Sequence, residues 1–198
     1  MLDTVSSSNS IGRILDAGLA LIRKRGDARV TMAQIAKAAR VSRQAVYLHF
    51  ADRAALMIAL ARHVDETVGL PAEIQRIAAA PSGAAMIEAM VSLQAQLNPA
   101  LWAVARALDA VRRTDAAAER AWQDRLDSRL KGCRAIVAQL RTEGSLAPAL
   151  DPSVAADLLW TITSLRTWED LVLARGWSPQ RYQREIARLL IETLTRRR

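Results

Sequence analysis

Arg43, Gln44, Tyr47 and His49 are side chains that hydrogen-bond bases or phosphates, and they stand together in one short segment. The segment is TMAQIAKAARVSRQAVYLHF, residues 31–50. Arginine pairs bidentately with guanine and glutamine with adenine, and each good pair discriminates by about 1 to 3 kcal/mol. The chemistry that these residue types offer is recognition of nucleic acid.

Two short helices joined by a tight turn would position these side chains. Ala36 supplies the small residue that two steeply crossing helices need, and Val46 points inward from the second helix. Ser42 is the expected N-cap of that helix. A recognition helix enters the major groove by its N-terminal end, where Arg43 and Gln44 stand. The spacing predicts a DNA-reading helix-turn-helix; the alternative is an alanine-rich helical hairpin that shows the pattern by chance.

Charge is concentrated on the same part of the chain. Residues 1–62 contain ten Lys or Arg against four Asp, a balance of +6, so the other 136 residues carry +2 of the total of +8. A basic block on the segment that holds the motif indicates a polyanionic partner. Simple solvation of a basic surface is the alternative explanation.

Asp52 and Arg53 mark the start of a further helix. Asp52 is the expected N-cap, and the helix is expected to run to about Gly69. A cation in the first turn opposes the helix dipole, but a phosphate bound there would reverse the sign. Thr31 occupies the corresponding place before the first motif helix, so Thr31 and Arg53 are predicted to contact phosphates.

The chain resembles the TetR-like family of transcriptional regulators (TetR/AcrR type) over roughly residues 8–68. The resemblance rests on the apolar stripe Ile14, Leu15, Leu19 and Ile22, on Gly26 as a terminator, on the run 30–36, and on Tyr47-Leu48-His49-Phe50 followed by Asp52-Arg53. It implies a DNA-binding surface made of Thr31, Arg43, Gln44, Ala45, Tyr47, His49 and Arg53. Arg40 departs from the pattern, because glycine is common in this turn and a left-handed non-glycine residue costs about 1 kcal/mol.

The remaining sequence predicts an all-α protein. Helix periodicity recurs throughout and strand-like alternation is nearly absent. Pro, Gly and N-cap residues divide the chain into nine main helices, and the family resemblance implies the same number. We expect a DNA-binding domain at 8–68 with its motif at 31–50, and a regulatory and dimerisation domain at 69–198. The expected helices are 10–25, 32–39, 43–49, 53–69, 82–97, 99–112, 115–143, 152–175 and 179–196, with a short segment at 72–79.

The two C-terminal helices carry wide apolar stripes. A two-fold protein is needed to read two half-sites about 34 Å apart, and the resemblance implies that these helices pair with those of a second copy. The alternative is that both helices cover the core of their own domain. The predicted homodimer contacts are Leu158, Ile162, Leu165, Trp168, Ile186 and Leu190.

The middle helices are where the resemblance implies a small-molecule pocket. Pockets for organic ligands are mostly apolar with a few fixed polar groups. Met or Trp at helical spacing is more often core than ligand wall. The predicted ligand residues are Met90, Trp102 and Trp122, with Arg106 and Asp109 as orienting groups. The effector itself is unknown.

An enzyme is the rival class, and the sequence disfavours it. His49 and His63 are the only histidines, neither has metal-ligand spacing, and no nucleophile elbow or phosphate-binding glycine loop occurs. No catalytic residue, metal or cofactor is predicted. No signal-type run or stretch of about 18 apolar residues is present, so we expect no membrane association and a cytoplasmic location. The sequence favours a DNA-binding repressor released from a palindromic operator by an effector; a helical binding module without DNA is the further alternative.

Overall fold

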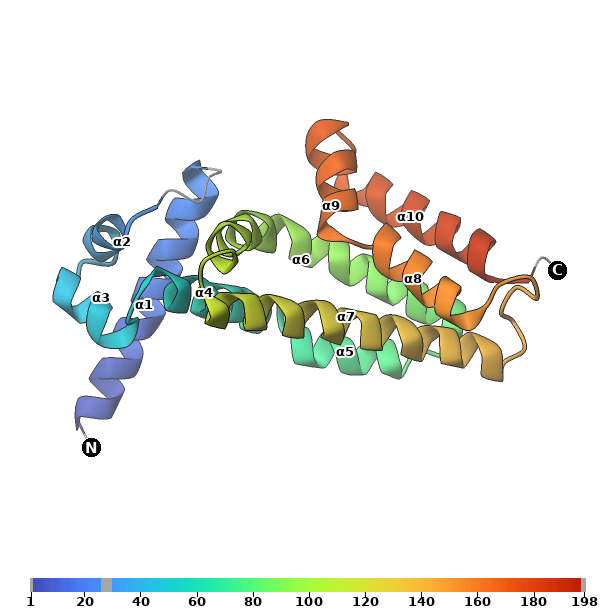
Figure 1. Cartoon of the computed structure of the whole chain (residues 1–198), viewed down its shortest axis with the longest axis horizontal. Coiled ribbons are helices and arrows are strands. Elements are labelled where there is room, and N and C mark those ends of the chain that lie inside the picture. The colour runs from blue at the N-terminus through green and yellow to red at the C-terminus, as the bar shows by residue number, and fades with distance from the viewer. Residues whose placement is uncertain (1, 26–29, 197–198) are drawn as a thin grey trace. The chain divides into compact units, whose positions relative to one another are not determined.

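The computed structural model describes the backbone of residues 2–25 and 30–196 and the side chains of residues 10–25 and 30–196. Helices dominate this part of the chain, and no strand occurs in it. The prediction of an all-α fold is confirmed (Figure 1). The helices are α1 (Leu2–Arg25), α2 (Met32–Ala39), α3 (Arg43–His49), α4 (Arg53–Val68), α5 (Leu70–Ala78), α6 (Gly83–Arg112), α7 (Ala116–Thr142), α8 (Pro152–Ile162), α9 (Leu165–Trp168), the π-helical segment η1 (Glu169–Ala174) and α10 (Pro179–Leu194).

The chain divides into two compact units. The first contains the residues up to Thr67 together with Ala100–Gln123, and the second contains Val68–Pro99 and Asp124–Arg198. The first division lies beside the domain boundary predicted after residue 68. Residues 100–123, which the sequence placed in the second domain, cluster with the first unit.

The first unit is built on α1. Its predicted apolar stripe is buried, with Ile14 and Ile22 fully enclosed. Leu56 and Leu60 of α4 are also fully buried, and His63 Nε2 lies 2.7 Å from Asp16 Oδ1 of α1. Figure 1 shows α2 and α3 on the same side of α1. The predicted stop at Gly26 lies outside the described residues.

The core of the second unit comes from α6, α7, α8 and α10. Its fully buried side chains include Ile87, Leu140, Leu159 and Leu190. Gly83 lies so close to Leu140 that a Cβ there would stand 2.5 Å from Leu140 Cδ2. The amide of Gly83 donates to the Glu143 carboxylate, at 3.0 Å to Oε1, which fixes the start of α6 against the end of α7.

The predicted break at Asn98-Pro99 is wrong. The single helix α6 runs for 30 residues with Pro99 inside it. Proline removes a backbone hydrogen bond and usually kinks a helix, at a cost of about 3 kcal/mol or more. Leu97 and Leu101 are buried on either side of Pro99, and burial of this apolar face offsets the lost bond.

The helix predicted at 152–175 is also interrupted. It ends as α8 at Ile162, and Ser164 then caps α9 by accepting a hydrogen bond from the Thr167 amide. Thr163 donates its hydroxyl to the Leu159 carbonyl at 2.7 Å. Ser and Thr side chains compete in this way with the helical backbone, which explains the break. The short segment expected at 72–79 is α5, at 70–78.

Candidate nucleic-acid interface

The turn between α2 and α3 uses Arg40 in the left-handed conformation, with φ 56° and ψ 43°. Arg40 is the one non-glycine residue with positive φ among the residues that the structure describes. The Val41 amide donates to the Ala36 carbonyl at 3.0 Å, so the end of α2 is closed by the hydrogen-bond pattern that glycine usually provides. The tight turn therefore forms despite Arg40.

Capping residues fix where the two motif helices begin. The Thr31 hydroxyl accepts from the Gln34 amide at 3.3 Å, and Gln34 Oε1 accepts from the Thr31 amide at 2.9 Å. Such a reciprocal capping box satisfies two amides at the start of α2. Ser42 accepts from the Ala45 amide at 3.0 Å, as the N-cap prediction required.

The recognition helix α3 presents polar side chains outward. Val46 on the inner face of α3 is fully buried, whereas Arg43 and Gln44 in its first turn are exposed. Tyr47 is 46% exposed, and Ala45 is half-buried. The structure thus puts the two predicted base-reading residues together at the N-terminal end of the helix.

His49 and Arg53 are tied to neighbouring elements. His49 Nε2 lies 2.9 Å from the Ser10 hydroxyl of α1. Arg53 Nη1 donates to the Val30 carbonyl at 2.7 Å, so the guanidinium reaches the residue that precedes Thr31. The start of α4 and the start of α2 are thereby brought together, and Asp52 caps α4 through the Ala55 amide.

The comparisons with known proteins bear on this geometry. Residues 14–60 match the family model described as bacterial regulatory proteins, tetR family. The match covers the helix-turn-helix segment and supports a TetR-type DNA-binding domain there. No curated protein sequence gives a significant match to the chain.

Solved structures share the TetR-like fold over almost the whole chain. A putative transcriptional regulator from Saccharomonospora viridis, in complex with choline, has 16% identity and a TM-score of 0.81, covering 96% of this chain and 100% of its own. The regulator FadR from Bacillus subtilis, in complex with stearoyl-CoA, has 17% identity and a TM-score of 0.73, covering 92% and 98%. SmeT, the repressor of the Stenotrophomonas maltophilia efflux pump SmeDEF, has 19% identity and a TM-score of 0.66, covering 93% and 90%. The chain therefore has a TetR-like fold, and its helix-turn-helix segment matches the TetR family model.

Two residues that lie at the TetR-type motif were not predicted from the sequence. Leu48 is 78% exposed, although it is apolar. Its position two residues after buried Val46 puts it about 200° around the helix, so the helical period already placed it outside. Ser10, which contacts His49, lies 39 residues away in the sequence, and no local pattern marks it.

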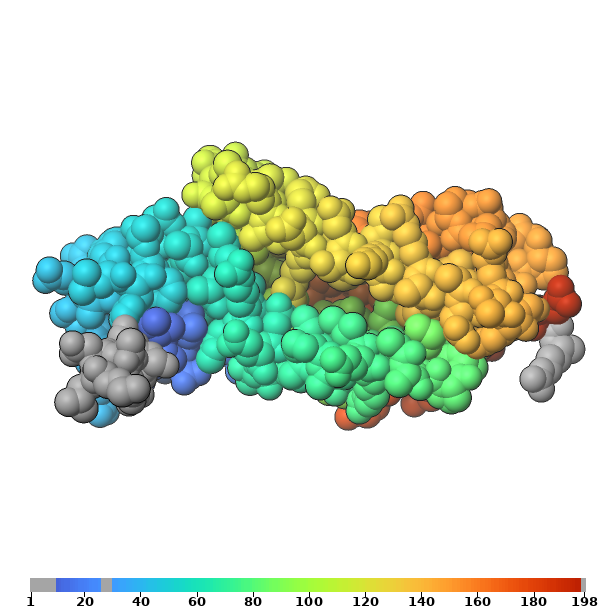
Figure 2. Space-filling view, turned by 90° about the horizontal axis from the view of Figure 1, so that it is seen from below, coloured from blue at the N-terminus to red at the C-terminus, as the bar shows by residue number. Residues whose placement is uncertain are grey.

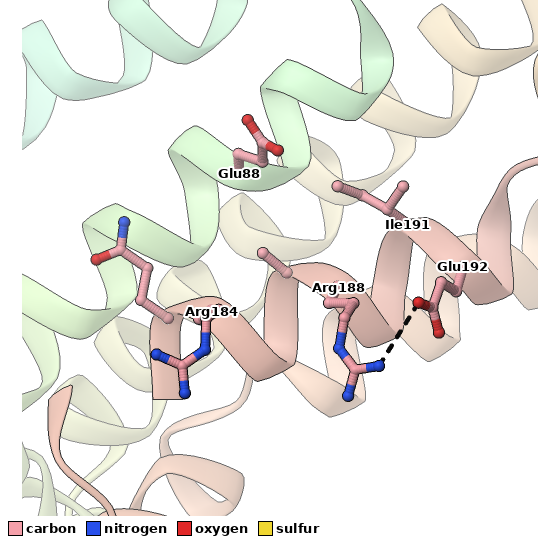
Figure 3. Close-up of a pocket in the computed structure, with 7 residues that line it drawn as sticks. Glu88, Arg184, Arg188, Ile191 and Glu192 are labelled. Carbon is pink, nitrogen blue, oxygen red and sulfur yellow. Dashed lines mark ion pairs between the residues drawn. The ribbon is translucent and has the colours of Figure 1, made fainter. Parts of the chain in front are cut away.

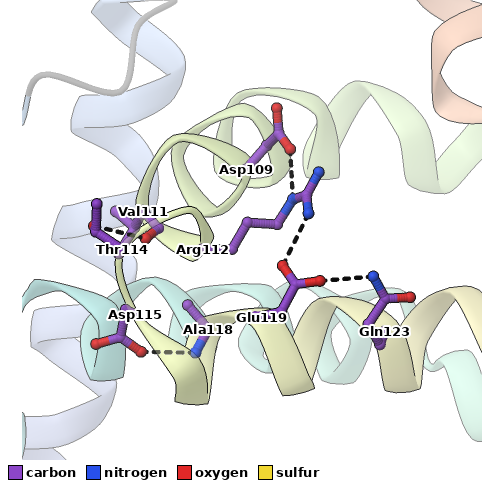
Figure 4. A network of polar contacts seen from close by, with 8 residues as sticks. All are labelled: Asp109, Val111, Arg112, Thr114, Asp115, Ala118, Glu119 and Gln123. Atoms are coloured by element: carbon purple, nitrogen blue, oxygen red, sulfur yellow. Dashed lines mark hydrogen bonds and ion pairs between the residues drawn. The ribbon is translucent and has the colours of Figure 1, made fainter.

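The five predicted ligand residues do not form one site within either unit. Met90 is buried in the second unit, and the other four belong to the first. Asp109 and Trp122 both contact Arg112. Arg112 donates to Asp109 at 2.6 Å (Figure 4). Its guanidinium lies 5.0 Å from the centroid of the Trp122 ring. Arg106 and Asp109 line a surface hollow with Ala110 and Arg113.

The Arg112 network closes the turn from α6 to α7. Glu119 accepts from Arg112 at 2.8 Å and from Gln123 at 2.7 Å. The hydrogen bonds from Gln123 and Arg112 lower the pKa of Glu119, and those to Glu119 and Asp109 raise the pKa of Arg112. Asp109 and Trp122 thus have a role in holding these two helices within the first unit.

A groove in the second unit lies between α6 and α10. Glu88 borders it from α6, and Arg184, Arg188, Ile191 and Glu192 border it from α10 (Figure 3). Arg188 and Glu192 are 3.6 Å apart and form an ion pair. This open, charged groove contains none of the predicted ligand residues.

The predicted dimer residues divide into two groups. Trp168, Ile186 and Leu190 are buried, at 3%, 4% and 0% exposure, so they belong to the core of the chain itself and offer no surface to a second copy. Leu158, Ile162 and Leu165 are half-buried. The exposed apolar side chains of this region are instead Val154 in α8, Leu173 in η1 and Leu189 in α10.

The described residues also include no membrane-spanning helix and no metal-ligand cluster. None of their helices is both long and apolar enough to span a membrane. No group of three His, Cys, Asp or Glu side chains in the described part of the chain is arranged to hold a metal ion.

Proposed function

We propose that this chain is a homodimeric TetR-family repressor that leaves a palindromic operator when a small-molecule effector binds. The observation that carries the proposal is the exposure of Arg43 and Gln44 at the N-terminal end of α3. Side chains at this end of a recognition helix reach base edges in the major groove. Two copies of α3 would read two half-sites.

The polar residues around α3 divide by role. Arg43 and Gln44 read bases, whereas Tyr47, His49, Thr31 and Arg53 hold phosphates. Support comes from the Arg53 contact with the Val30 carbonyl, which gathers two helix N-termini at one place. Half-buried Ala45 permits close approach, and exposed Leu48 is suited to the methyl group of thymine.

Regulation by an effector is supported by the neighbours in structure. FadR is described in complex with stearoyl-CoA, the Saccharomonospora viridis protein in complex with choline, and SmeT as a repressor. These ligands differ in charge and size, so the neighbours support an effector without naming its class.

The test of DNA binding uses variants with different expected effects. The operator is first selected from a random DNA pool, and affinity is then measured by fluorescence anisotropy over a range of salt. Arg53→Ala should weaken binding to every sequence and reduce the salt slope by about one. Gln44→Ala should relax preference at one base pair, by about 1 to 3 kcal/mol. Arg141→Ala, an exposed arginine of α7, is the control and should change neither.

Equal losses for Arg53→Ala and Gln44→Ala on operator and random DNA would refute the division into positioning and reading residues. If Arg43→Ala and Tyr47→Ala leave DNA binding unchanged, α3 is not the surface that binds DNA, whereas a helical binding module of another kind would show no DNA binding at all. The operator screen itself separates these outcomes, because a module without DNA affinity selects no sequence.

The dimer is tested through the exposed apolar residue of α10. Leu189→Glu should shift the sedimentation coefficient toward that of a monomer, because a charge in an apolar interface is costly. Ile74→Glu, at an exposed isoleucine of α5, is the matched control and should leave the sedimentation coefficient unchanged. A monomeric wild-type chain at micromolar concentration would overturn the proposed homodimer.

A further inference from the structure

The second unit contains a part-buried cation without an acidic partner. Arg129, in α7, donates one hydrogen bond from Nη2 to the Trp160 carbonyl at 2.8 Å. Its Cζ lies 5.2 Å from the centroid of the Trp160 ring. No carboxylate of the described residues pairs with Arg129. Apart from the Trp160 carbonyl and ring, the guanidinium has no counterpart among the described residues, and no carboxylate there balances its charge.

A second polar group in the same unit also lacks a partner. Tyr182, in α10, is fully buried, and its hydroxyl makes no hydrogen bond with any described residue. Burial raises the pKa of Tyr182 to about 12, and the Arg129 charge opposes this rise. Cys133 is buried one helical turn after Arg129, and burial raises the pKa of its thiol to about 11. Both groups are neutral at pH 7, so they leave the Arg129 charge uncompensated.

A structural role explains only part of this arrangement. Trp160 lies in the last turn of α8, where carbonyl groups lack helical partners, and a cation there is favourable. Arg129 thus clamps the end of α8. The clamp uses one donor and leaves the Tyr182 hydroxyl unexplained, although an unpaired buried hydroxyl is destabilising.

The surface of the unit is hollowed beside these helices. In Figure 2 the hollow is bordered by α7, in yellow, and by the green α5–α6 segment. Atoms in the red tones of the C-terminal helices lie at its bottom. Arg129 comes from α7 and Tyr182 from the C-terminal helix α10.

We propose that Arg129 and Tyr182 bind the carboxylate of a small organic acid, with the Trp160 ring beside the guanidinium. Arginine holds a carboxylate bidentately, and the Tyr182 hydroxyl supplies a further donor. A cationic ligand would be repelled by the uncompensated charge. This inference rests on the regulatory function proposed above, because it names the chemical class of its effector.

Isothermal titration calorimetry on the full chain tests the inference with four probes. Decanoate and benzoate carry the carboxylate, decanol lacks the charge, and choline reverses it. We expect decanoate or benzoate to bind, decanol to bind at least about 10-fold more weakly than decanoate, and choline not to bind. Failure of both carboxylates to bind at about 1 mM would overturn the inference.

Variants test whether the carboxylate binds at Arg129 and Tyr182. Arg129→Gln should weaken carboxylate binding by about 10-fold or more, and Tyr182→Phe by about 3- to 10-fold. Arg134→Gln, an exposed arginine of the same helix, should leave it unchanged. If Arg129→Gln destabilises the chain but keeps full affinity, Arg129 is only the clamp of α8 and the inference fails.

The Tyr182→Phe variant and a DNA-binding measurement without carboxylate separate failure of the carboxylate site from failure of the proposed regulator. If Arg129→Gln does not fold, Tyr182→Phe decides, because it removes only an oxygen without a partner; undiminished affinity in that variant refutes the site. DNA binding of the wild type is measured without any carboxylate. A chain that binds decanoate through Arg129 but selects no DNA sequence would retain the site and reject the proposed regulator.

Discussion

The α2–α4 segment of the first unit carries Arg43, Gln44 and Tyr47 on its surface, whereas the second unit encloses the Tyr182 hydroxyl and the Trp168 indole nitrogen. Both of these enclosed groups lack hydrogen-bond partners among the described residues. An exposed polar group keeps its water until a partner arrives, but a buried one has lost its water on folding. In α2–α4 the polar side chains available for binding therefore do not reduce the stability of the fold. In the second unit the buried polar groups without partners do reduce it.

Tight packing in the second unit gives the largest expected effect. Gly83→Ala should lower the free energy of unfolding by about 1 to 3 kcal/mol, because its Cβ would overlap the Leu140 side chain. Gly18→Ala is the matched change in the first unit, where a Cβ would stand 3.3 Å from Leu60 Cδ2. The helix propensity of alanine offsets that milder contact, so its change should be below about 1 kcal/mol. Urea denaturation measures both; equal losses would mean that the two units are packed alike.

Buried hydroxyls give the next effect, which tests the comparison directly. Tyr182→Phe should raise the free energy of unfolding by about 1 kcal/mol, because it removes an unpaired buried group. Tyr47→Phe should leave stability within about 0.5 kcal/mol and weaken DNA binding instead. Thermal unfolding and anisotropy on the same samples supply the measurements. A loss of stability in Tyr182→Phe would show that this hydroxyl has a partner in solution.

The left-handed turn gives a smaller effect in the first unit. Arg40→Gly should raise the free energy of unfolding by about 0.5 to 1 kcal/mol, because glycine adopts φ 56° without steric cost. Arg40→Ala keeps the strain of a non-glycine residue at positive φ but removes the charge. It therefore serves as the control that separates backbone strain from charge. If the alanine variant is stabilised as much as the glycine variant, charge rather than backbone strain explains the gain.

The smallest effect is the pH dependence of the Glu143 contact. Hydrogen bonds from Gln139 and from the Gly83 amide lower the pKa of Glu143 below its ordinary value of 4.5. Its contribution to stability is therefore complete above pH 4.5 and is lost as the pH falls through the lowered value. Glu143→Gln should flatten this part of the stability curve, measured by denaturation between pH 3 and 6, about the range where glutamate titrates. Glu88→Gln, at an exposed position of α6, is the control and should not change the pH dependence of stability.

Local signals in the sequence predicted much of the fold. Ser42 is the expected N-cap of α3, and Asp151 and Ser178 cap α8 and α10 in the same way, because capping depends on residues within one turn. Gly144 and Gly176 take positive φ at 65° and 68°, as helix C-termini require. The predicted break at Pro99 was wrong because burial of the surrounding face, which depends on contacts with residues distant in sequence, outweighs the local preference of proline.

The helical periodicity of apolar residues could not distinguish contacts within the chain from contacts with a second copy. Trp168, Ile186 and Leu190 follow a helical stripe, but a stripe buried in its own core and one buried against a second copy look alike in sequence. The uncompensated Arg129 and the Tyr182 hydroxyl stand 53 positions apart in the chain. Neither belongs to a motif, so only the folded chain shows that Arg129 has no acidic partner and that the Tyr182 hydroxyl has no hydrogen bond among the described residues.

The π-helical segment at 169–174 has a consequence for how this region tolerates changes in length. A π turn closes its hydrogen bonds over one residue more than an α turn does. In genetic terms, η1 is a place where the loss of a single codon would return the backbone to an ordinary α-helix. Because the deleted residue is the extra one of the π turn, the α9 side chains would keep their orientation relative to those that follow. Lineages of this chain are thus expected to vary in length here while keeping the helices on both sides.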